Sequence, residues 1–285
     1  MKKPLYKNLQ LIKNEPLFGN EDLFGDLAVK KGWTTLFLGK FSLQEVYTVM
    51  EKRNFTRDAQ KRKLWPLDYD LDSSQFPLQR FRIYYKNKEP ENMIVDLKIR
   101  EGVFQPKKPT GLNFPKSEFL ILDWLTLQNP LKDFTANRSP LPGQKYPGLS
   151  LGRKILDLFV YLGRLLKKDG LLAFPAYFHN AVLFSRGFIF VNPEKEAEVA
   201  AIHRLFKKVH FKDLAWIVYL NCLQDKEGRM YEWKAEEQVY PFSQSLKEYF
   251  TSKKYEEKRR EAFSRVNYKI NWDCYEKMFP RFRKR

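Results

Sequence analysis

The alternation of apolar and polar residues predicts several strands in the first half of the chain. Residues 34–41, TTLFLGKF, predict a strand, and residues 79–86 and 93–100, separated by the turn-rich NKEPEN, predict a β-hairpin. Residues 118–127, EFLILDWLTL, form a longer apolar run, which is typical of a central strand with both faces covered. Residues 55–77 are charged and contain two prolines, and they predict a short helix followed by a loop.

Helices are predicted where apolar residues recur every three or four positions. Residues 42–55 open with Ser42 and, three positions later, Glu45, which is the spacing of a capping box. Over residues 151–168 the polar positions recur three or four apart, so this helix has a narrow solvent-facing stripe. Another helix begins at Pro193, where acidic residues in the first turn suit the helix dipole.

Strands predicted at residues 171–177 and 187–192 flank the short helical segment HNAVLFSR. The predicted order is strand, helix, hairpin, central strand, loop, helix, strand, short helix, strand, helix, which is the order of an α/β protein with a layered sheet. We divide the chain into an irregular lead-in at residues 1–33, an α/β domain at 34–225, and a basic, aromatic-rich helical extension at 226–285.

The chain is strongly basic. Its 285 residues include 52 Lys and Arg against 34 Asp and Glu, which gives a formal net charge of +18. Such an imbalance favours polyanionic partners, such as phosphate-bearing cofactors, nucleic acid or an anionic membrane, and it is equally compatible with a solvated basic surface. The 43% hydrophobic content is enough to bury a core.

The cysteine count and the apolar runs bear on the compartment. With only Cys222 and Cys274, neither a disulfide framework nor a CxxC metal site can be built, which fits a reducing cytoplasm. The N-terminal lysines precede no apolar segment, and the most apolar helical stretch is interrupted by Asp157 and Arg164. We therefore expect a cytoplasmic protein with no signal peptide, no membrane span and no membrane partner.

The stretch YPGLSLGRKIL, residues 146–156, places Gly148 and Gly152 four apart where a helix begins. Glycine lowers helix stability but lets the backbone approach another group closely. The spacing does not fit a P-loop, which has four residues between its glycines and Lys-Ser/Thr after the second, nor a dinucleotide-binding G-x-G-x-x-G. Two interpretations stay open: an anion site at the start of the helix, or a tight strand-to-helix corner.

This loop and its surroundings resemble those of the GCN5-related N-acetyltransferases. In that family a central strand is followed by a loop of the form Q/R-G-x-G-x-G/A, whose amides hold the pyrophosphate of acetyl-CoA. Residues 147–152, PGLSLG, match this form, with Pro147 in place of Gln or Arg and Ser150 in place of the middle glycine. Arg153 and Lys154, which follow, would add positive charge beside the pyrophosphate.

A second match follows in the right order. The family continues with a strand, an Asn, a short helix and a Gly-Phe pair, and residues 171–188 contain these features. The resemblance extends over residues 34–192 and implies an acetyltransferase-like mixed sheet flanked by helices, with acetyl-CoA or another acyl-CoA as cofactor and an amine as acceptor. The residues that it implies for cofactor binding are Leu125, Leu127, Pro147, Gly148, Leu149, Ser150, Leu151, Gly152, Arg153, Asn180 and Phe184.

The resemblance also implies groups that move protons. Acyl transfer to an amine needs a base that deprotonates the amine and an acid that protonates the leaving thiolate. Asp123, on the central strand near the loop, is the candidate base; the alternative is a carboxylate paired with a surplus Lys or Arg. The usual acid of the family is a Tyr in the short helix, where this chain has Phe184, so the acid is Tyr177, His179 or solvent, or catalysis has been lost.

No further catalytic or metal-binding pattern stands out. His203 and His210 are seven apart on a helical pattern, two turns from each other, so we expect no metal. Neither cysteine lies in a glycine-rich or turn context and G-x-S-x-G does not occur, which argues against a hydrolase.

The rival function is that of a nucleic-acid-binding or other non-catalytic protein with a degenerate acetyltransferase fold. In the C-terminal region, Lys and Arg alternate with Tyr249, Phe250, Tyr255 and Phe263, which can bind phosphates and stack on bases. Aromatic residues at this spacing also form the buried stripe of a helix, with the basic residues on its wet face, and we favour this packing role. A basic extension that binds an acidic protein, or an RNA that is itself the acceptor, stays open.

Overall fold

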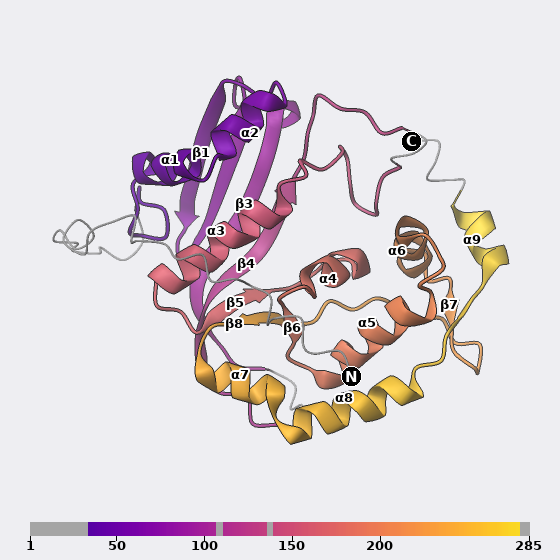
Figure 1. Cartoon of the computed structure of the whole chain (residues 1–285). Helices are drawn as coiled ribbons and strands as arrows, with labels where there is room; N and C mark the ends of the chain where they lie inside the picture. Colours follow the sequence, from indigo (N-terminus) through magenta and orange to yellow (C-terminus); the bar gives the residue numbers. More distant parts are fainter. Residues whose placement is uncertain (1–33, 107–110, 136–138, 280–285) are drawn as a thin grey trace. The chain divides into compact units, whose positions relative to one another are not determined.

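A computed structural model describes residues 34–106, 111–135 and 139–279 (Figure 1). The lead-in predicted at residues 1–33 lies outside the described residues. The chain divides into two compact units: unit 1 is Met1–Gly102, Leu120–Lys132 and Gly148–Tyr161, and unit 2 is Val103–Phe119, Asp133–Pro147 and Leu162–Arg285. The elements in chain order are α1 (Leu43–Lys52), α2 (Phe55–Lys61), β1 (Leu67–Gln75), β2 (Leu78–Tyr85), η2 (Pro90–Asn92), β3 (Met93–Phe104), β4 (Ser117–Leu127), α3 (Gly152–Leu165), β5 (Gly170–Ala173), α4 (Phe178–Phe184), β6 (Ile189–Phe190), α5 (Pro193–Leu205), α6 (Phe211–Tyr219), β7 (Leu223–Gln224), β8 (Gln238–Pro241), α7 (Gln244–Thr251), α8 (Lys253–Arg265), β9 (Lys269–Ile270) and α9 (Trp272–Met278).

The strands confirm the predicted α/β class, a mixed sheet flanked by helices. A seven-stranded sheet has the order β1-β2-β3-β4-β5-β8-β6, and β7 pairs with β9 in a two-stranded sheet. β2 is antiparallel to both β1 and β3, which confirms the hairpin predicted at 79–86 and 93–100. β8 is antiparallel to both β5 and β6, so β5 and β6 run in the same direction. Across the described parts of the chain, no helix has the length and apolar character needed to cross a membrane.

In unit 1 the apolar face of the first strands packs against α1. Tyr69 on β1 stacks on Phe81 of β2, and Tyr47 on α1 lies edge-on to Tyr69 with ring centroids 5.5 Å apart. The predicted capping box of α1 is confirmed. The amide of Glu45 donates to Ser42 Oγ at 3.2 Å, and the amide of Ser42 donates to Glu45 Oε2 at 2.6 Å. The cap sets the start of the helix and thereby the face that it buries.

The strand predicted at residues 34–41 is wrong. The chain makes a tight, buried turn there, with left-handed backbone at Leu38 (φ 53°) and Gly39 (φ 67°). The amide of Leu38 donates to the buried side chain of Gln79 on β2, whose Nε2 donates to the carbonyl of Leu36 at 2.9 Å. Because a side chain takes these backbone hydrogen bonds, the apolar run fills the core without a strand partner.

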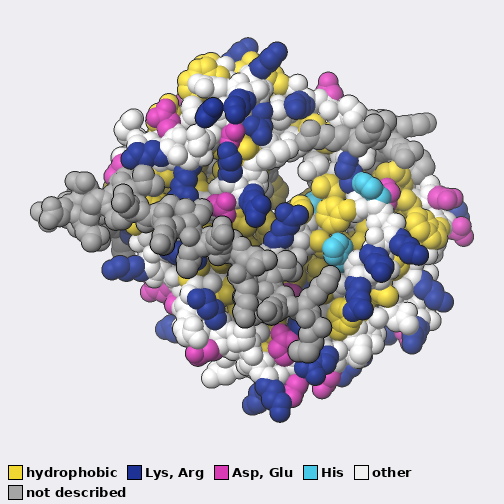
Figure 2. All heavy atoms as spheres, viewed as in Figure 1, with side chains coloured by type: hydrophobic (Ala, Val, Ile, Leu, Met, Phe, Trp, Pro, Cys, Tyr) yellow, Lys and Arg dark blue, Asp and Glu magenta, His cyan; other side chains and the backbone are white. Residues whose placement is uncertain are grey.

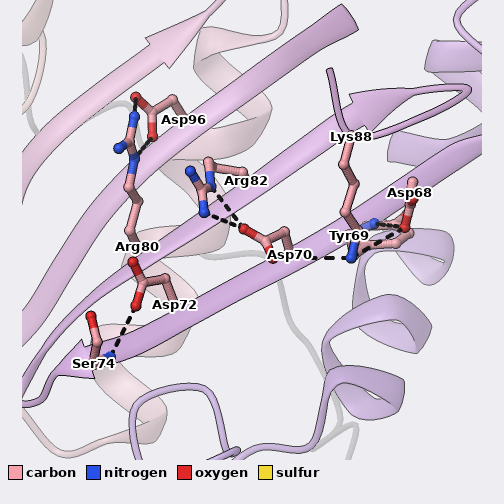
Figure 3. Close-up of polar contacts among 9 residues, drawn as sticks. All are labelled: Asp68, Tyr69, Asp70, Asp72, Ser74, Arg80, Arg82, Lys88 and Asp96. Atoms are coloured by element: carbon pink, nitrogen blue, oxygen red, sulfur yellow. Dashed lines mark hydrogen bonds and ion pairs between the residues drawn. The ribbon is translucent and has the colours of Figure 1, made fainter. Parts of the chain in front are cut away.

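Residues 67–75 form strand β1, where the sequence predicts a loop. The loop is predicted because this segment, LDYDLDSSQ, is charged and lies between two prolines. Its alternation places apolar side chains on one face and aspartates on the other. Figure 3 shows Asp70 paired with Arg82 of β2, and Arg80 of β2 paired with Asp96 of β3, where Nε and Oδ1 are 2.7 Å apart. Cross-strand ion pairs of this kind contribute roughly 0.2–1 kcal/mol each, so arginines compensate the acidic face of this edge strand.

The segment predicted as a helical extension, residues 226–285, contributes to the core of unit 2. It contains the predicted helices, seen as α7, α8 and α9, and also β8, which lies between β5 and β6 in the sheet. Val239 of β8 is fully buried. β8 has four residues, too few to produce an alternation from which a strand could be predicted.

Tyr249, Phe250 and Tyr255 are buried, as the packing interpretation predicts, and Phe263 is half-buried. Tyr255 is 1% exposed and donates its hydroxyl to the carbonyl of Phe190 at 2.6 Å, and Tyr249 donates to the carbonyl of Val191 at 2.8 Å. Phe250 is buried beside them. Several basic residues of α8 pair with glutamates of the same helix, with N–O distances of 2.7 to 3.7 Å. These three rings are core residues and do not form a surface on which bases stack.

We expect Tyr255→Phe to lower the free energy of unfolding by about 1–2 kcal/mol, because the buried carbonyl of Phe190 loses its donor. Tyr255→Ala should lower it by about 3–5 kcal/mol, since it also opens a cavity. Urea unfolding followed by circular dichroism measures both. Lys254→Ala, at an exposed position of α8, is the control and should change stability by less than ~0.5 kcal/mol. Equal stabilities of the three variants would contradict a core position for α8.

Candidate functional site

The loop before α3 turns at Ser150 and not at its glycines. Gly148 forms an isolated antiparallel bridge with Gln128, which follows β4, and neither Gly148 nor Gly152 has a positive φ. The left-handed residue is Ser150, with a φ of 59°. Because Ser150 makes the turn, backbone conformation does not explain the glycines at the other two positions.

The side chains of this loop alternate between the interior and the surface. Ser150, Gly152 and Arg153 are exposed. The apolar members are buried and anchor the loop; they are Pro147, Leu149 and Leu151. The predicted cofactor residues Pro147, Leu149 and Leu151 therefore hold the loop from the interior, and those with an exposed position are Ser150, Gly152 and Arg153.

Gly152 is the first residue of α3, and the space beside it is open. A Cβ built on Gly152 would meet no atom within 4 Å. The first backbone bond of the helix joins the Ile155 amide to the Leu151 carbonyl at 3.1 Å. The amides of Gly152, Arg153 and Lys154 have no hydrogen-bond partner among the described residues. Unpaired N–H groups at a helix N-terminus are an anion-binding arrangement.

Arg62, directly after α2, fixes the loop. Its Nε donates to the carbonyl of Leu149 at 3.0 Å, and its Nη1 donates to the carbonyl of Asp58 at 2.7 Å. The Asp58 carboxylate forms an ion pair with Lys154 in the first turn of α3. The hydrogen bond from Lys154 lowers the pKa of Asp58. Lys154 is therefore occupied by Asp58, and Arg153 is the first-turn cation that has no ion-pair partner within the described ranges.

Positive charge is dense around this loop. Helix α2 exposes Arg57 and Lys61, and the exposed Lys63 follows shortly after the helix. Figure 2 shows Lys and Arg side chains gathered over α2 and α3. The first turn of α3 contains no acidic residue. The local potential therefore favours an anion over a cation at the start of α3.

The second half of β4 carries the predicted base and two predicted cofactor contacts. Residues 119–122 are buried, and the residues after them are half-buried or exposed. Asp123 accepts from Arg100 Nε of β3 at 2.8 Å, so its carboxylate lies in an ion pair, the alternative that the sequence leaves open. Asp123, Leu125 and Leu127 alternate along the strand and share one face.

In unit 2, Tyr177 and His179 lie together at the start of α4. Their rings stack with centroids 5.3 Å apart and an interplanar angle of 15°. Tyr177 is half-buried, and its hydroxyl has no hydrogen-bond partner in the described part of the chain. His179 is 3% exposed, its Nδ1 has no described partner, and burial lowers its pKa to about 4. At neutral pH the imidazole is uncharged, so Tyr177 is the better proton donor of the two.

The other two predicted residues of α4 differ in what surrounds them. Asn180 is half-buried, and its backbone N–H donates to the carbonyl of Tyr177 at 3.1 Å within the first turn of α4. Phe184 stacks on Phe188 with ring centroids 5.3 Å apart. Phe184 therefore packs the turn between α4 and β6 and supplies no proton.

Arg62, Asp58 and Arg100 support the site, and sequence reasoning does not find them. Their partners lie 87, 96 and 23 positions away in the sequence. No local spacing encodes such pairs; the cluster of basic residues around α2 is the one signal that points toward them. In the described residues no group of three or more His, Cys, Asp or Glu side chains is placed to hold a metal ion.

The buried, neutral His179 predicts a pH dependence of stability. Its folded-state pKa of about 4 lies below the ordinary histidine value of 6.5, so the unfolded chain binds the proton more readily between these values. The stability that the neutral ring contributes is complete above pH ~6.5 and is lost as the pH falls toward ~4, by about 2 kcal/mol at pH ~5. Urea unfolding at pH ~7.5 and pH ~5 should show this loss in the wild type and in His210→Gln, an exposed control.

In His179→Gln the loss between the two pH values should be much smaller, whatever the absolute stability of the variant. If this variant does not fold, an NMR titration of the wild-type histidines replaces it, and the His179 signal should stay unmoved down to pH ~5. A His179 ring that protonates near pH ~6.5 would contradict its burial.

No protein-family model matches this sequence, and comparisons with curated proteins and with solved structures give no match either. The resemblance to acetyltransferases therefore rests on the residues that carry it, those of the glycine loop and of the segment through Phe188.

Proposed function

We propose that the chain is an acyl-CoA-dependent N-acyltransferase with an acetyltransferase-like fold, and that residues 148–153 hold the pyrophosphate of the acyl-CoA. The observation that carries the proposal is the open start of α3. A side chain at Gly152 would meet no described part of the chain, so packing inside the protein does not require a glycine there. A ligand that must approach the backbone closely does require one.

The physical chemistry of the loop suits a diphosphate. The amides of Gly152, Arg153 and Lys154 lie in consecutive positions at the positive end of the helix dipole. Arg153 adds a cation that no described acidic residue neutralises. The guanidinium of Arg62 holds the Leu149 carbonyl at 3.0 Å, which keeps the loop in one conformation before a ligand arrives.

The order and the lengths of the elements also support the proposal. After β4 come the loop, α3, β5, α4 and β6, the order that the resemblance implies. β4 has eleven residues and β5 has four, so β5 is too short to pair with the whole of β4. The half-buried Leu125 and Leu127 in the second half of β4 are apolar surfaces of the kind that a pantetheine chain contacts.

In the proposed reaction the amine nitrogen attacks the thioester carbonyl, the carbon–sulfur bond breaks, and the CoA thiolate takes a proton. We assign the proton donor to the Tyr177 hydroxyl, since it is half-buried and has no described partner. Asp123 is the assigned base. Its carboxylate also accepts from Arg100 Nε at 2.8 Å, so in the proposed reaction it acts on the amine through a bridging water.

The proposal predicts that CoA or acetyl-CoA raises the melting temperature and that Gly152→Asp abolishes this shift. At a CoA concentration of 100 times Kd the stabilisation is about 2.7 kcal/mol, or a rise of roughly 5–10 °C. The carboxylate that this substitution introduces would occupy the anion site. Because an acidic side chain at a helix N-terminus stabilises by about 0.3–1 kcal/mol, the melting temperature of the variant without ligand should be unchanged or higher.

Two controls separate loss of the site from loss of the fold. Gly152→Ala adds a methyl group that the chain accommodates, so it should fold normally and keep a reduced CoA shift. Ser264→Asp adds the same charge at an exposed position of α8 and should keep the full shift. No shift of the wild type at millimolar CoA, or a full shift in Gly152→Asp, would contradict the proposal.

Polyanion binding by unit 2 is the second candidate function, and the segment between α5 and α6 favours it. Residues 203–212, HRLFKKVHFK, contain six basic or titratable side chains and no acidic one. None of the six forms an ion pair with a described residue, in contrast to Lys253, Arg259 and Arg265 of α8. Figure 2 shows Lys, Arg and His side chains close together over the region of α5 and α6. A nucleic acid would bind here through its phosphates.

For this second candidate we expect the double variant Lys207→Glu/Lys208→Glu to weaken binding of a single-stranded RNA at least ~10-fold. Loss of two phosphate contacts should also reduce the slope of log K against log salt by about 1.4. Fluorescence anisotropy at several salt concentrations measures both. Lys253→Glu/Lys254→Glu on α8 makes the same charge change and should alter binding much less. Equal losses in the two double variants would leave only a general effect of net charge and would exclude a site at residues 203–212.

A further inference from the structure

The two cysteines of the chain lie side by side in unit 2, although 52 positions separate them in the sequence. Cys222 Sγ is 2.8 Å from Cys274 Sγ, and both are free thiols. Cys222 precedes β7, and Cys274 is in the first turn of α9. Two thiols in direct contact can be joined by oxidation without a large movement of the backbone.

Backbone hydrogen bonds hold the two cysteines in this position. Leu223 pairs with Ile270 between β7 and β9, and the amide of Asn271 donates to the carbonyl of Cys222 at 2.9 Å. The side chain of Asn271 then accepts from the Cys274 amide at 2.9 Å, which caps α9. One asparagine therefore links the backbone of Cys222 to that of Cys274, and the contact between the sulfurs follows from the fold.

The two thiols differ in their surroundings. Cys222 is fully buried, and burial, followed by its contact with Cys274, raises its pKa to about 12. Cys274 is half-buried, so a small reagent can reach it. This asymmetry assigns an order: Cys274 reacts first with an outside reagent, and Cys222 resolves the product from within.

We propose that Cys222 and Cys274 are an oxidation site that forms an intramolecular disulfide between α9 and the start of β7. With a small disulfide such as oxidised glutathione as the oxidant, the Cys274 thiolate attacks one of its sulfurs, and one glutathione thiol leaves. Cys222 then loses its proton and attacks Cys274 Sγ, and the second glutathione thiol leaves. Two S–H bonds of the protein are replaced by one S–S bond, and the two electrons reduce glutathione disulfide to two thiols.

The disulfide changes how firmly α9 is attached. In the reduced chain, the short β7–β9 ladder holds the residues just before α9, and the Tyr275 hydroxyl of α9 donates to Asp213 Oδ1 at 3.1 Å. The covalent bond closes a loop of about fifty residues, and a loop of this length stabilises the folded state mainly by restricting the unfolded chain. Oxidation should therefore raise the melting temperature by about 5 °C or more.

The test incubates the full native chain with a glutathione redox buffer and then traps free thiols with N-ethylmaleimide. The expected product has lost two hydrogens, carries neither glutathione nor maleimide, and gives a tryptic species in which residues 213–226 and 270–277 are joined. The fraction of cross-linked chain at a fixed ratio of reduced to oxidised glutathione gives the equilibrium constant for disulfide formation. This constant should be at least ~10-fold larger for the native chain than for the chain in urea, because the fold brings the thiols together.

Cys274→Ala is the matched control, since it removes the accessible thiol and leaves the buried one. It should form no cross-link and show no difference in melting temperature between oxidising and reducing buffer. A stable glutathione adduct on Cys274, disulfide-linked dimers, or equal cross-linking in native buffer and in urea would each overturn the proposal. The equilibrium constant for the cross-link is measured on the wild-type chain, so the test does not depend on a variant that fails to fold.

Discussion

The hydrogen bond from Arg62 to the carbonyl of Leu149 fixes the stretch of backbone on which the functional interpretation depends. Leu149 and Leu151 are buried, Ser150 is in a left-handed turn, and the first amides of α3 have no hydrogen-bond partner among the described residues. Other helices of this protein begin differently. A Ser or Asn side chain accepts from a first-turn amide in α1, α5, α7, α8 and α9. Helices α2 and α4 also begin without a side-chain cap, and what distinguishes α3 is that its first residue is a glycine beside open space.

The cations that give the chain its net charge of +18 are of two kinds, those paired with an acidic side chain and those without a described acidic partner. Many cations are compensated: Arg80 and Arg82 by aspartates across the sheet, and several of those in α8 by glutamates of the same helix. Others, on α2, at Arg153 and at residues 203–212, have no described acidic partner. Composition alone cannot make this distinction, because an ion pair and an unpaired cation count equally in a sum. The distinction matters, since compensated charges attract polyanions far less than unpaired ones.

Sequence reasoning found the elements whose determinants are local and missed those set by distant contacts. The capping box of α1 and the apolar run of β4 can be recognised within one segment, and both are confirmed. β8 is a four-residue strand because β5 and β6 lie on either side of it, and residues 34–41 form a turn because the Gln79 side chain takes the Leu38 amide. The same limit applies to the site. The glycine loop can be recognised in the sequence, but Arg62 and Asp58, which hold it, act over 87 and 96 positions.

Burial also decides which proton transfers the proposed reaction can use. Desolvation lowers the pKa of His179 to about 4, so its imidazole is a weak base at neutral pH, and the Asp123 carboxylate is engaged by Arg100. An alkylamine with a pKa near ~10.4 is almost entirely protonated at pH ~7, and a weak base removes its proton slowly. An acceptor with a less basic amine needs less help, because a large fraction of it already carries a free lone pair. In the proposed reaction, weakly basic amines are therefore the favoured acceptors, and the departing thiolate takes the proton that we assign to Tyr177.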